Sequence, residues 1–528
     1  MKMQVQSNDG EFVPLSKSPI WEILQSYYKE MGVDAWQPNA VPNYVTTNPF
    51  IANSYAQVID GFFQDYGRTK SGGSGSETHY IIELGAGSGR FAYRFLKHFF
   101  SKEQIALRKK MDIVYLMTDI SDANIDFWRN HSELKPFIDQ GVLDFAYFDV
   151  LAKDRIELVV SGKRLKPESM EAPIAVIANY VIDSIPHDFF TIRNGKLYER
   201  LVNCEVKTAE PEIQKIVKNT RLRYSDQPCS PNYYMDKNWN KILGEYCREA
   251  TDMNLAMPVG GFLAIDRLCA LTAGPVFLLS SDFGDSNIAA ISDLPPRHVA
   301  QNGTFNLLVN YHALIRYAEI NKGQAFVPDQ AKFSLETVGI LMNAGRKKPR
   351  QVASEFKRHI NDFGPAEFFM MKKLAEKDFD THDIGKILAL LRLSRWDTKI
   401  FLGCAGSLLQ QLPDIGPWVR QSVIDALLKV DEMYFRCDRT MDPAIVILRH
   451  LLALDAREEA FGVLKKNEKF LMITADGCMA LAETYRQFGK NSEAVINVRR
   501  ALALEPKHPD AHQFLAQISQ GLDEVQPA

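Results

Sequence analysis

The chain has 528 residues, of which 46% are hydrophobic and 24% are charged, and its formal net charge is -3. This composition excludes disordered and collagen-like chains, and the length predicts two or three domains. The weak net charge offers no field that would collect nucleic acid or an anionic membrane, so we expect neither as a partner. We interpret the basic run at 346–350 as a solvated loop.

Seven cysteines lie scattered along the chain, and none forms a Cys-x-x-Cys pair. An odd number at irregular spacing predicts neither a disulfide framework nor a zinc site, so we expect no metal. The first residues are polar without a signal-peptide pattern, and no apolar run is long enough to cross a bilayer. We therefore expect a cytoplasmic protein in a reducing compartment.

Helical patterns open the chain. Apolar residues at helical spacing follow Ser18 and Pro19, and a second helical pattern covers 54–66. We therefore expect a helical N-terminal cap over about 15–66. The segment 68–76, rich in glycine and serine, is predicted to be a surface loop.

From Tyr80 onward, short apolar runs alternate with helical patterns, which indicates βαβ units and a parallel sheet. The predicted strands are 80–84, 113–118, 144–148, 174–178 and 276–280. Asn194 followed by Gly195 predicts a hairpin within 189–198. We interpret the polar stretch 210–257 as a helical insertion over the sheet's edge, and as a candidate element for substrate recognition.

Strand signals are not seen beyond about Leu335, and helical periodicity continues to the end of the chain. We expect a first domain over 1–335, a helical connecting region over 336–440 and a repeat-bearing helical region over 441–528. The residues at tetratricopeptide offsets are Leu481, Ala482, Tyr485, Gly489, Ala494, Val498, Ala501 and Pro506, with a restart at Leu515 and Ala516. A stable solenoid needs about three repeats, so this region should pack on the helices before it. A role in binding a partner and a purely structural role both stay open.

The most informative segment is Glu83-Leu84-Gly85-Ala86-Gly87-Ser88-Gly89, in which a glycine-rich turn joins an apolar strand to a helix. Glycines allow a tight turn and let a ligand lie against the main chain. The spacing is Gly-x-Gly-x-Gly, whereas dinucleotide enzymes use Gly-x-Gly-x-x-Gly. The alternative is a tight turn that binds nothing.

This segment resembles motif I of class I S-adenosylmethionine (SAM) methyltransferases. A cofactor with a sulfonium cation and no pyrophosphate tolerates the carboxylate of Glu83 just before the turn. The predicted cofactor-binding residues here are Glu83, Gly85, Ala86, Gly87 and Gly89.

Two aspartates end the next two predicted strands, at the edge where open α/β sheets bind ligands. We expect Asp119 to accept hydrogen bonds from both ribose hydroxyls of the cofactor. Asp149 is expected to bind the adenine amino group, with Phe148 or Val150 beside the ring. Each aspartate alone would more often be a helix cap, so the prediction depends on their occurring together.

The segment Ala178-Asn179-Tyr180-Val181-Ile182-Asp183-Ser184-Ile185-Pro186 resembles a motif of the MidA-like methyltransferases, the family of the mitochondrial complex I assembly methyltransferase. Further patches similar to this family are 44–47, 198–202, 279–284 and 309–311. The chain departs from the family at Tyr180, where a glutamate is usual, and at Asn310, where an aspartate is usual.

The resemblance implies an α/β class I fold with SAM as cofactor, and for the mitochondrial member it implies arginine methylation of a protein. Carboxylates assist such a reaction because they orient the guanidinium and hold its charge. The candidates on the acceptor side are Asn179, Asp183 as orienting carboxylate and His187 as base, with Asp282 as a second-line candidate. Asp183 as a turn cap and His187 as a structural residue are the alternatives.

Three functions follow from the sequence. The first is a SAM-dependent methyltransferase acting on a protein side chain, with the helical tail holding the substrate or a protein partner. The second is a non-catalytic assembly or scaffold protein that keeps a SAM-binding fold. The third is a methyltransferase acting on a small molecule.

Overall fold

The computed structural model describes residues 10–37, 40–67, 77–101, 111–152, 156–165, 170–206, 212–292, 294–301, 303–330, 335–437 and 442–523. The predicted loop at 68–76 lies outside these residues. The chain forms two compact units, Met1–Met370 and Met371–Ala528. No helix among the described residues is long and apolar enough to cross a membrane.

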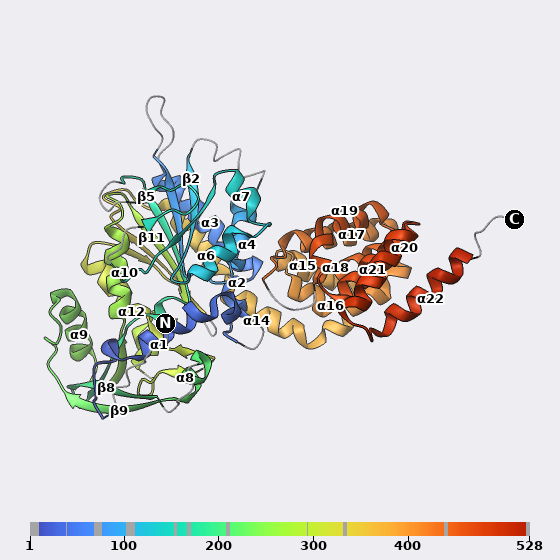
Figure 1. Ribbon diagram of the computed structural model, residues 1–528. Coiled ribbons are helices and arrows are strands. Elements are labelled where there is room, and N and C mark those ends of the chain that lie inside the picture. The colour runs from blue at the N-terminus through green and yellow to red at the C-terminus, as the bar shows by residue number, and fades with distance from the viewer. Residues whose placement is uncertain are drawn as a thin grey trace. The chain divides into compact units, whose positions relative to one another are not determined.

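A seven-stranded sheet forms the centre of the first unit (Figure 1). Its strands, in spatial order, are β16 (Gln324–Phe326), β17 (Glu336–Met342), β11 (Val276–Asp282), β6 (Ile174–Asn179), β1 (His79–Leu84), β2 (Ile113–Asp119) and β3 (Leu143–Tyr147). The five strands from β11 to β3 run parallel, and β17 and β16 add antiparallel pairs at one edge. All five predicted strands lie in this sheet, so the predicted α/β fold is confirmed.

The expectation that strands end before Leu335 is wrong, because β17 pairs with β11 along its whole length. Every residue of β17 is buried. A short buried strand is an apolar run without alternation, which periodicity does not separate from a buried helix. The first unit consequently continues through α13 (Arg350–Phe356) to Met370.

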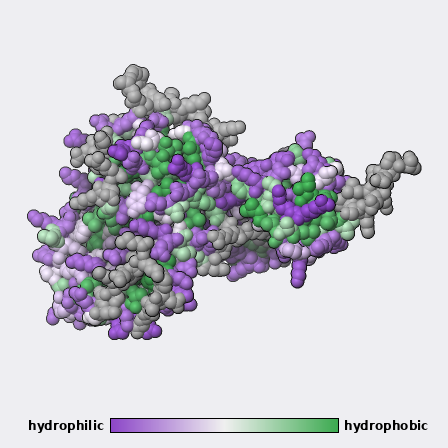
Figure 2. Space-filling view, in the orientation of Figure 1, coloured by the Kyte–Doolittle hydropathy of each residue, from purple (hydrophilic) through white to green (hydrophobic). Residues whose placement is uncertain are grey.

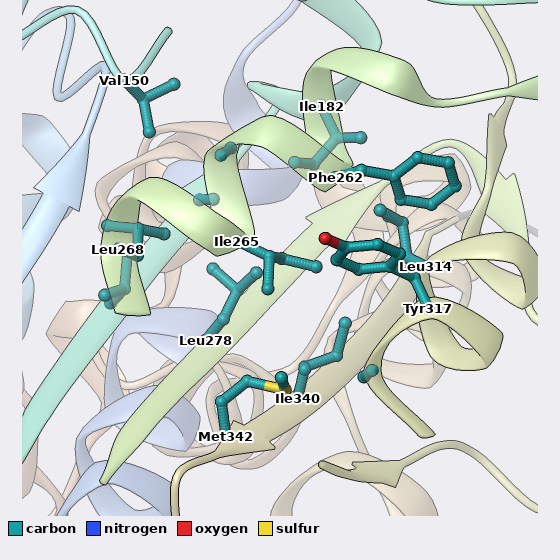
Figure 3. Packing of buried hydrophobic residues seen from close by; sticks show 14 of the residues in the cluster. Val150, Ile182, Phe262, Ile265, Leu268, Leu278, Leu314, Tyr317, Ile340 and Met342 are labelled. Atoms are coloured by element: carbon teal, nitrogen blue, oxygen red, sulfur yellow. The ribbon is translucent and has the colours of Figure 1, made fainter. Parts of the chain in front are cut away.

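Helices cover both faces of the sheet. On one face, α10 (Val259–Cys269) and α12 (Tyr311–Ile320) place Ile265 and Leu314 over Leu278 of the sheet (Figure 3). The other face carries α3 (Pro49–Tyr66) and α4 (Arg90–Phe99). Ring contacts fix this second layer, with Phe62 of α3 on Phe277 at 5.4 Å between ring centroids.

The helices of the predicted N-terminal cap belong to two different parts of the first unit. Nearly every residue of α3 is buried, so this helix is a layer of the sandwich and not a cap. The earlier helix α1 (Ile20–Met31) packs instead with α8 (Ile213–Asn219) against a second sheet. Its residues Trp21 and Leu24 belong to that second apolar core.

The second sheet is antiparallel, in the order β10 (Met253–Met257), β7 (Asp188–Arg193), β8 (Lys196–Val206) and β9 (Thr220–Pro228). The predicted hairpin is confirmed, because Asn194 and Gly195 join β7 to β8 with positive φ angles. The prediction of a helical insertion over 210–257 is wrong in part, since this stretch contains the strands β9 and β10 as well as the helices α8 and α9 (Lys237–Glu249). Strand β9 alternates between an inner face with Leu222 and Tyr224 and an exposed polar face, but two partly buried apolar residues make this signal short.

Short elements complete the first unit. They are η1 (Leu15–Lys17), η2 (Gly32–Trp36), α2 (Tyr44–Thr47), α6 (Asp122–Arg129), α7 (Lys135–Asp139), β4 (Ile156–Glu157), β5 (Arg164–Leu165), η3 (Ile182–Ser184), β12 (Gly284–Asp285), α11 (Ile288–Ser292), β13 (Ala300–Gln301), β14 (Phe305–Asn306), β15 (Val309–Asn310) and the π-helix η4 (Lys357–Asp362).

The second unit is helical. Its elements are the end of α14 (Pro365–Ala375), η5 (Glu376–Thr381), α15 (Ile384–Leu393), α16 (Thr398–Gln411), η6 (Leu412–Asp414), α17 (Pro417–Met433), α18 (Pro443–Ala453), α19 (Arg457–Leu471), α20 (Ala475–Gln487), α21 (Asn491–Leu504) and α22 (Pro509–Asp523). The helices α20 and α21 form the predicted repeat pair, and Leu481, Tyr485 and Val498 are buried in it. As expected, α20 packs on α18 and α19. Hydrophobic patches interrupt the hydrophilic surface of this unit on the face in view (Figure 2).

Candidate functional site

A cavity of about 120 Å³ lies at the carboxyl ends of β1, β2, β3 and β6. Its lining combines strand ends with the N-terminal helix α1: Trp21, Leu24, Gln25, Tyr28, Trp36, Leu84, Gly85, Asp119, Ile120, Asn124, Phe148, Asp149, Val150, Leu151, Asn179, Tyr180, Val181, Ser184, Ile185 and Pro186. A smaller cavity of about 30 Å³ touches Glu83, Ala86 and Gly87. Trp36, Gly85 and Tyr180 line both cavities, so the two are neighbours.

The glycine-rich turn has the backbone that its sequence predicts. Gly85, Gly87 and Gly89 all have positive φ, at 59°, 54° and 77°. Residues with a side chain rarely adopt this conformation, which explains the glycines. Gly85 is open, since a Cβ there would meet only Val181, at 3.4 Å.

Gly89 serves packing rather than the cavity. It lines neither of the two cavities, and a Cβ there would lie 3.1 Å from Trp128. The Trp128 indole in turn donates a hydrogen bond to the Gly87 carbonyl at 3.0 Å. Gly89 therefore lets Trp128 hold the turn, and Ala86 supports it by donating its N–H to the Thr118 carbonyl.

The turn is covered at Gly87. A Cβ at this position would lie 2.7 Å from the indole of Trp36, which stacks on Tyr28 with 5.6 Å between ring centroids. The indole Nε1 is buried and has no hydrogen-bond partner among the described residues. The hollow that the sequence predicts over the turn is therefore occupied by Trp36 on its Gly87 side and accessible at Gly85.

Glu83 faces the helix layer of α3 and α4 and touches the smaller cavity. Its carboxyl accepts a hydrogen bond from the Tyr115 hydroxyl at 2.9 Å. Burial raises the pKa of Glu83 to about 8, because the charged form loses its hydration. At neutral pH this residue is mostly a neutral acid, so the expected fixed negative charge beside the turn is weakened.

Asp119 points into the turn and lines the larger cavity. Its Oδ2 accepts from the Gly87 N–H at 3.0 Å and from Asn124 Nδ2 at 3.1 Å, and its Oδ1 accepts from the Ser121 N–H at 3.0 Å. A carboxylate offers about four acceptor sites, so roughly one remains for a ligand. That is fewer than two ribose hydroxyls need. Burial raises the pKa of Asp119, while these donors oppose the rise.

Asp149 and Phe148 follow β3 and both line the larger cavity. Asp149 Oδ1 accepts the Leu151 N–H at 2.9 Å, as a turn cap does, and its Oδ2 accepts no hydrogen bond from the described residues. Phe148 is 6% exposed and lies in the apolar part of the wall. Asp149 thus combines the two roles that the sequence left open, since one oxygen caps the turn and the other is available.

Asn179 ends β6 and lines both cavities. Its Oδ1 accepts a hydrogen bond from the Tyr55 hydroxyl at 2.9 Å, and Tyr55 also contacts Ser281 Oγ at 2.5 Å. The Nδ2 of Asn179 is buried without a partner in the described part of the chain. This arrangement holds the amide fixed and aims an unused donor at the cavity wall.

Asp183 and Asp282 form a pair of buried carboxyl groups. The Asp183 N–H donates to Asp282 Oδ2 at 3.1 Å, and the Ser184 hydroxyl donates to Asp183 Oδ1 at 2.8 Å. Neither carboxyl has an ion-pair partner among the described residues. Burial raises the pKa of Asp183 to about 7, and burial together with repulsion from Asp183 raises the pKa of Asp282 well above its usual range.

His187 does not reach either cavity. It is fully buried, and its Nε2 shares a hydrogen bond of 2.8 Å with the Ile182 carbonyl. Burial lowers the pKa of His187 to about 4, because the imidazolium would lose its hydration. The structure therefore contradicts our assignment of His187 as a base facing the acceptor and gives it a packing role.

Most residues of the larger cavity were not predicted as site residues, and Tyr28, Trp36, Tyr180 and Ser184 are among them. Tyr28 and Trp36 come from the N-terminal segment, so only tertiary packing brings them here. Tyr180 has a φ of 53°, unusual for an aromatic residue, and stacks on Phe283 with 5.7 Å between ring centroids. No local sequence signal marks such a backbone. Asn310, a departure from the family pattern, caps α12 by accepting the Ala313 N–H.

Two family models match parts of this chain. Residues 62–266 match the family described as "Putative S-adenosyl-L-methionine-dependent methyltransferase", and residues 475–518 match a tetratricopeptide repeat. No curated protein matches the chain.

The solved structures to which this chain is similar include two proteins of one superfamily from Burkholderia thailandensis. One, bound to S-adenosyl-homocysteine, shares 15% identity over 60% of this chain and 74% of its own, with a TM-score of 0.39. The other, a native structure, shares 14% identity over the same fractions, with a TM-score of 0.38. The CMeT domain of the citrinin polyketide synthase shares 12% identity over 51% of this chain and 47% of its own, with a TM-score of 0.24.

The residues at the strand ends fit an adenosyl cofactor. Gly85 leaves the main chain bare, Asn179 Nδ2 and Asp149 Oδ2 are unused polar atoms, and Phe148 supplies an apolar wall. Trp36 fits poorly, since it covers Gly87, and Asp119 has already accepted three hydrogen bonds. The predicted cofactor, SAM, and the predicted tetratricopeptide tail are both confirmed by the family matches. Over residues 62–266 this chain is therefore similar to the family of S-adenosyl-L-methionine-dependent methyltransferases.

Proposed function

We propose that this protein transfers the methyl group of SAM to a nitrogen of a protein side chain, and that arginine is the acceptor. The observation that carries this proposal is the buried pair Asp183 and Asp282, which has no cationic partner among the described residues. Two carboxyl groups in an apolar setting favour a ligand that brings positive charge and several N–H donors. A guanidinium has both properties.

On the cofactor side, we assign binding to Gly85, Asp119, Asp149 and Phe148, which line the larger cavity together. Asn179 is a positioning residue there through its unused Nδ2. SAM supplies an activated methyl group on its sulfonium. The chain itself then has to align the acceptor and remove one proton from it.

We assign proton removal to Asp183. Its Oδ1 is occupied by the Ser184 hydroxyl, whereas its Oδ2 accepts no hydrogen bond within the described residues. Its pKa of about 7 is close to neutral pH, where a general base works best. Burial keeps this pKa high, and Asp282 orients Asp183 by accepting the hydrogen bond of the Asp183 main-chain N–H at 3.1 Å.

Tyr180 stands where the family usually has a glutamate, so a third carboxylate is missing. Its ring lines both cofactor cavities and stacks on Phe283. We propose that Tyr180 shapes the wall between cofactor and acceptor, and that Asp183 and Asp282 supply the charge that the glutamate would have added.

We propose that the tetratricopeptide region holds the protein substrate or a protein partner. The repeat pair α20 and α21 is well packed inside, and Ile496 on α21 is 59% exposed. A cytoplasmic location is part of the same proposal. It is supported by seven cysteines that are all free, as a reducing compartment requires.

The test uses the full chain, tritium-labelled SAM and lysate proteins. We expect label in the protein fraction, and methylated arginine after acid hydrolysis. Asp183→Asn should lower transfer at least about a hundredfold while SAM binding persists, because a general base contributes about that much. The control is Asp188→Asn, which changes an equally buried aspartate of β7 that lines no cavity described above and binds Ser16 and Tyr234. This control should keep its transfer rate.

Other outcomes would reject parts of the proposal. Label in a low-mass fraction would identify a small-molecule methyltransferase instead. Label on lysine or on a carboxyl group would reject arginine. Binding of SAM without transfer to any fraction would favour a scaffold role.

A further inference from the structure

A third cavity, of about 350 Å³, reaches η3 as the cofactor cavity does. Asp183 lines this third cavity, while its neighbour Ser184 lines the cofactor cavity. The rest of the wall comes from Phe189 of β7, Phe283 after β11 and residues 294–298, 300 and 306–308. The lining is mostly apolar, and Arg297 contributes a guanidinium side chain to it.

Arg297 is buried without a partner. Its side chain is 6% exposed, and its Nε has no hydrogen bond among the described residues. The described residues form no ion pair with its guanidinium either. Only its main-chain carbonyl is used, as the acceptor from Arg200 at 3.2 Å. Burial accordingly lowers the pKa of Arg297 to about 10, and Asp285 nearby opposes this only in part.

A buried guanidinium without partners is costly, because its charge and five donors lose their hydration. The nearly buried guanidinium of Arg436, by contrast, is paired with Asp442 at 2.8 Å. An anion in the third cavity would supply the missing partner. We propose that the third cavity is a binding site for a carboxylate group, which Arg297 holds, on a ligand whose remaining surface is largely apolar.

The surrounding charges favour a monoanion. Asp183 lines the same cavity, and Asp285 lies within electrostatic range of Arg297, so a phosphate dianion would be repelled. One guanidinium matches the two oxygens of one carboxylate in a planar fork. Phe189, Phe283 and Leu307 offer contacts to a hydrocarbon or aromatic body.

The test measures binding without SAM, so its result does not depend on the proposed methyl transfer. The probe is 3-phenylpropionate, and the matched neutral probe is 3-phenylpropionamide. Both are titrated by calorimetry and by thermal unfolding into the full chain, Arg297→Met, Arg297→Lys and Arg436→Met. The last variant is a control that removes a paired arginine of the second unit.

We expect the acid to bind and to raise the melting temperature of the natural chain, and the amide to do neither. Arg297→Met should weaken the acid at least about tenfold, Arg297→Lys should lie between, and Arg436→Met should bind normally. Without ligand, Arg297→Met should be at least as stable as the natural chain, since it removes an unpaired buried charge. Arg436→Met should be less stable.

Several results would overturn the site. These are equal binding of acid and amide, unchanged binding in Arg297→Met, or stronger stabilisation by inorganic phosphate than by the acid at equal ionic strength. Unfolding of Arg297→Met would also overturn it, because the guanidinium would then have a partner in the folded chain.

The carboxylate can come from a free acid or from the end of a peptide chain. An N-acetylated dipeptide that ends in phenylalanine, with a free carboxylate, separates these sources. Tighter binding of this peptide than of 3-phenylpropionate would assign the cavity to a chain terminus, and tighter binding of the acid would assign it to a small molecule.

Discussion

Replacing Glu83 with glutamine is expected to make the stability of the first unit less sensitive to pH. Burial raises the pKa of Glu83 from 4.5 to about 8 in the folded chain. Between these values the unfolded chain carries a charged Glu83 and the folded chain a neutral one. The stabilisation is therefore complete below pH 4.5, falls as pH rises, and is lost by about pH 8.

The magnitude follows from the width of this window. One pH unit inside it changes the free energy of unfolding by about 1.4 kcal/mol for one group. Between about pH 5.5 and 7.5 the natural chain should lose roughly 3 kcal/mol through Glu83. Glu83→Gln should lose none of this, and its amide oxygen can still accept the hydrogen bond of Tyr115. Other titrating groups act in both proteins and cancel in the comparison.

The measurement is urea unfolding of both proteins at the two pH values, followed by tryptophan fluorescence. Glu157→Gln serves as control, because Glu157 lies on the surface in a pair with Arg164. This control should follow the natural chain at both pH values. A constant difference in stability between Glu83→Gln and the natural chain would refute the reasoning, since Glu83 would then be ionised in the folded state.

Three further predictions concern single positions. Gly87→Ala should lower the free energy of unfolding by roughly 2–4 kcal/mol, because alanine is strained in a left-handed backbone and its Cβ would lie 2.7 Å from Trp36. Urea unfolding should show a smaller loss in a Trp36→Ala background. Equal losses in both backgrounds would argue against the contact. The pKa of His187, lowered to about 4, predicts that stability falls as pH drops from 6.5 towards 4, and that His187→Asn flattens this dependence; parallel curves would contradict it. Leu481→Ala should cost about 2–5 kcal/mol and speed hydrogen exchange in α20, because Leu481 is fully buried; unchanged exchange would place its support elsewhere.

The sequence predicts those parts of the fold whose signals are local. Strands β1, β2 and β6 are apolar runs followed by turn residues, and Asn194 with Gly195 specifies a tight hairpin. Strand β17 was missed because a fully buried strand lacks alternation. Strand β9 was missed for a different reason, since Leu222 and Tyr224 are the only large apolar residues in a stretch that is otherwise polar.

In the site, too, residues with a local sequence signal could be predicted, and residues placed by tertiary packing could not. Asp119 and Asp149 could be predicted because the carboxyl ends of parallel strands share one edge of a sheet. Trp36 could not, because its place over Gly87 depends on the packing of a segment far away in the sequence. His187 was misassigned because proximity to Asp183 in sequence does not set the direction of its ring.

The indole over the glycine-rich turn also has a kinetic consequence. A ligand that reaches the main chain at Gly87 has to displace Trp36, and with it the stack on Tyr28. Association should then occur in two steps, and the observed rate should level off at high ligand concentration when ring displacement becomes limiting. Smaller side chains at position 36 would speed capture of the ligand but also hasten its escape.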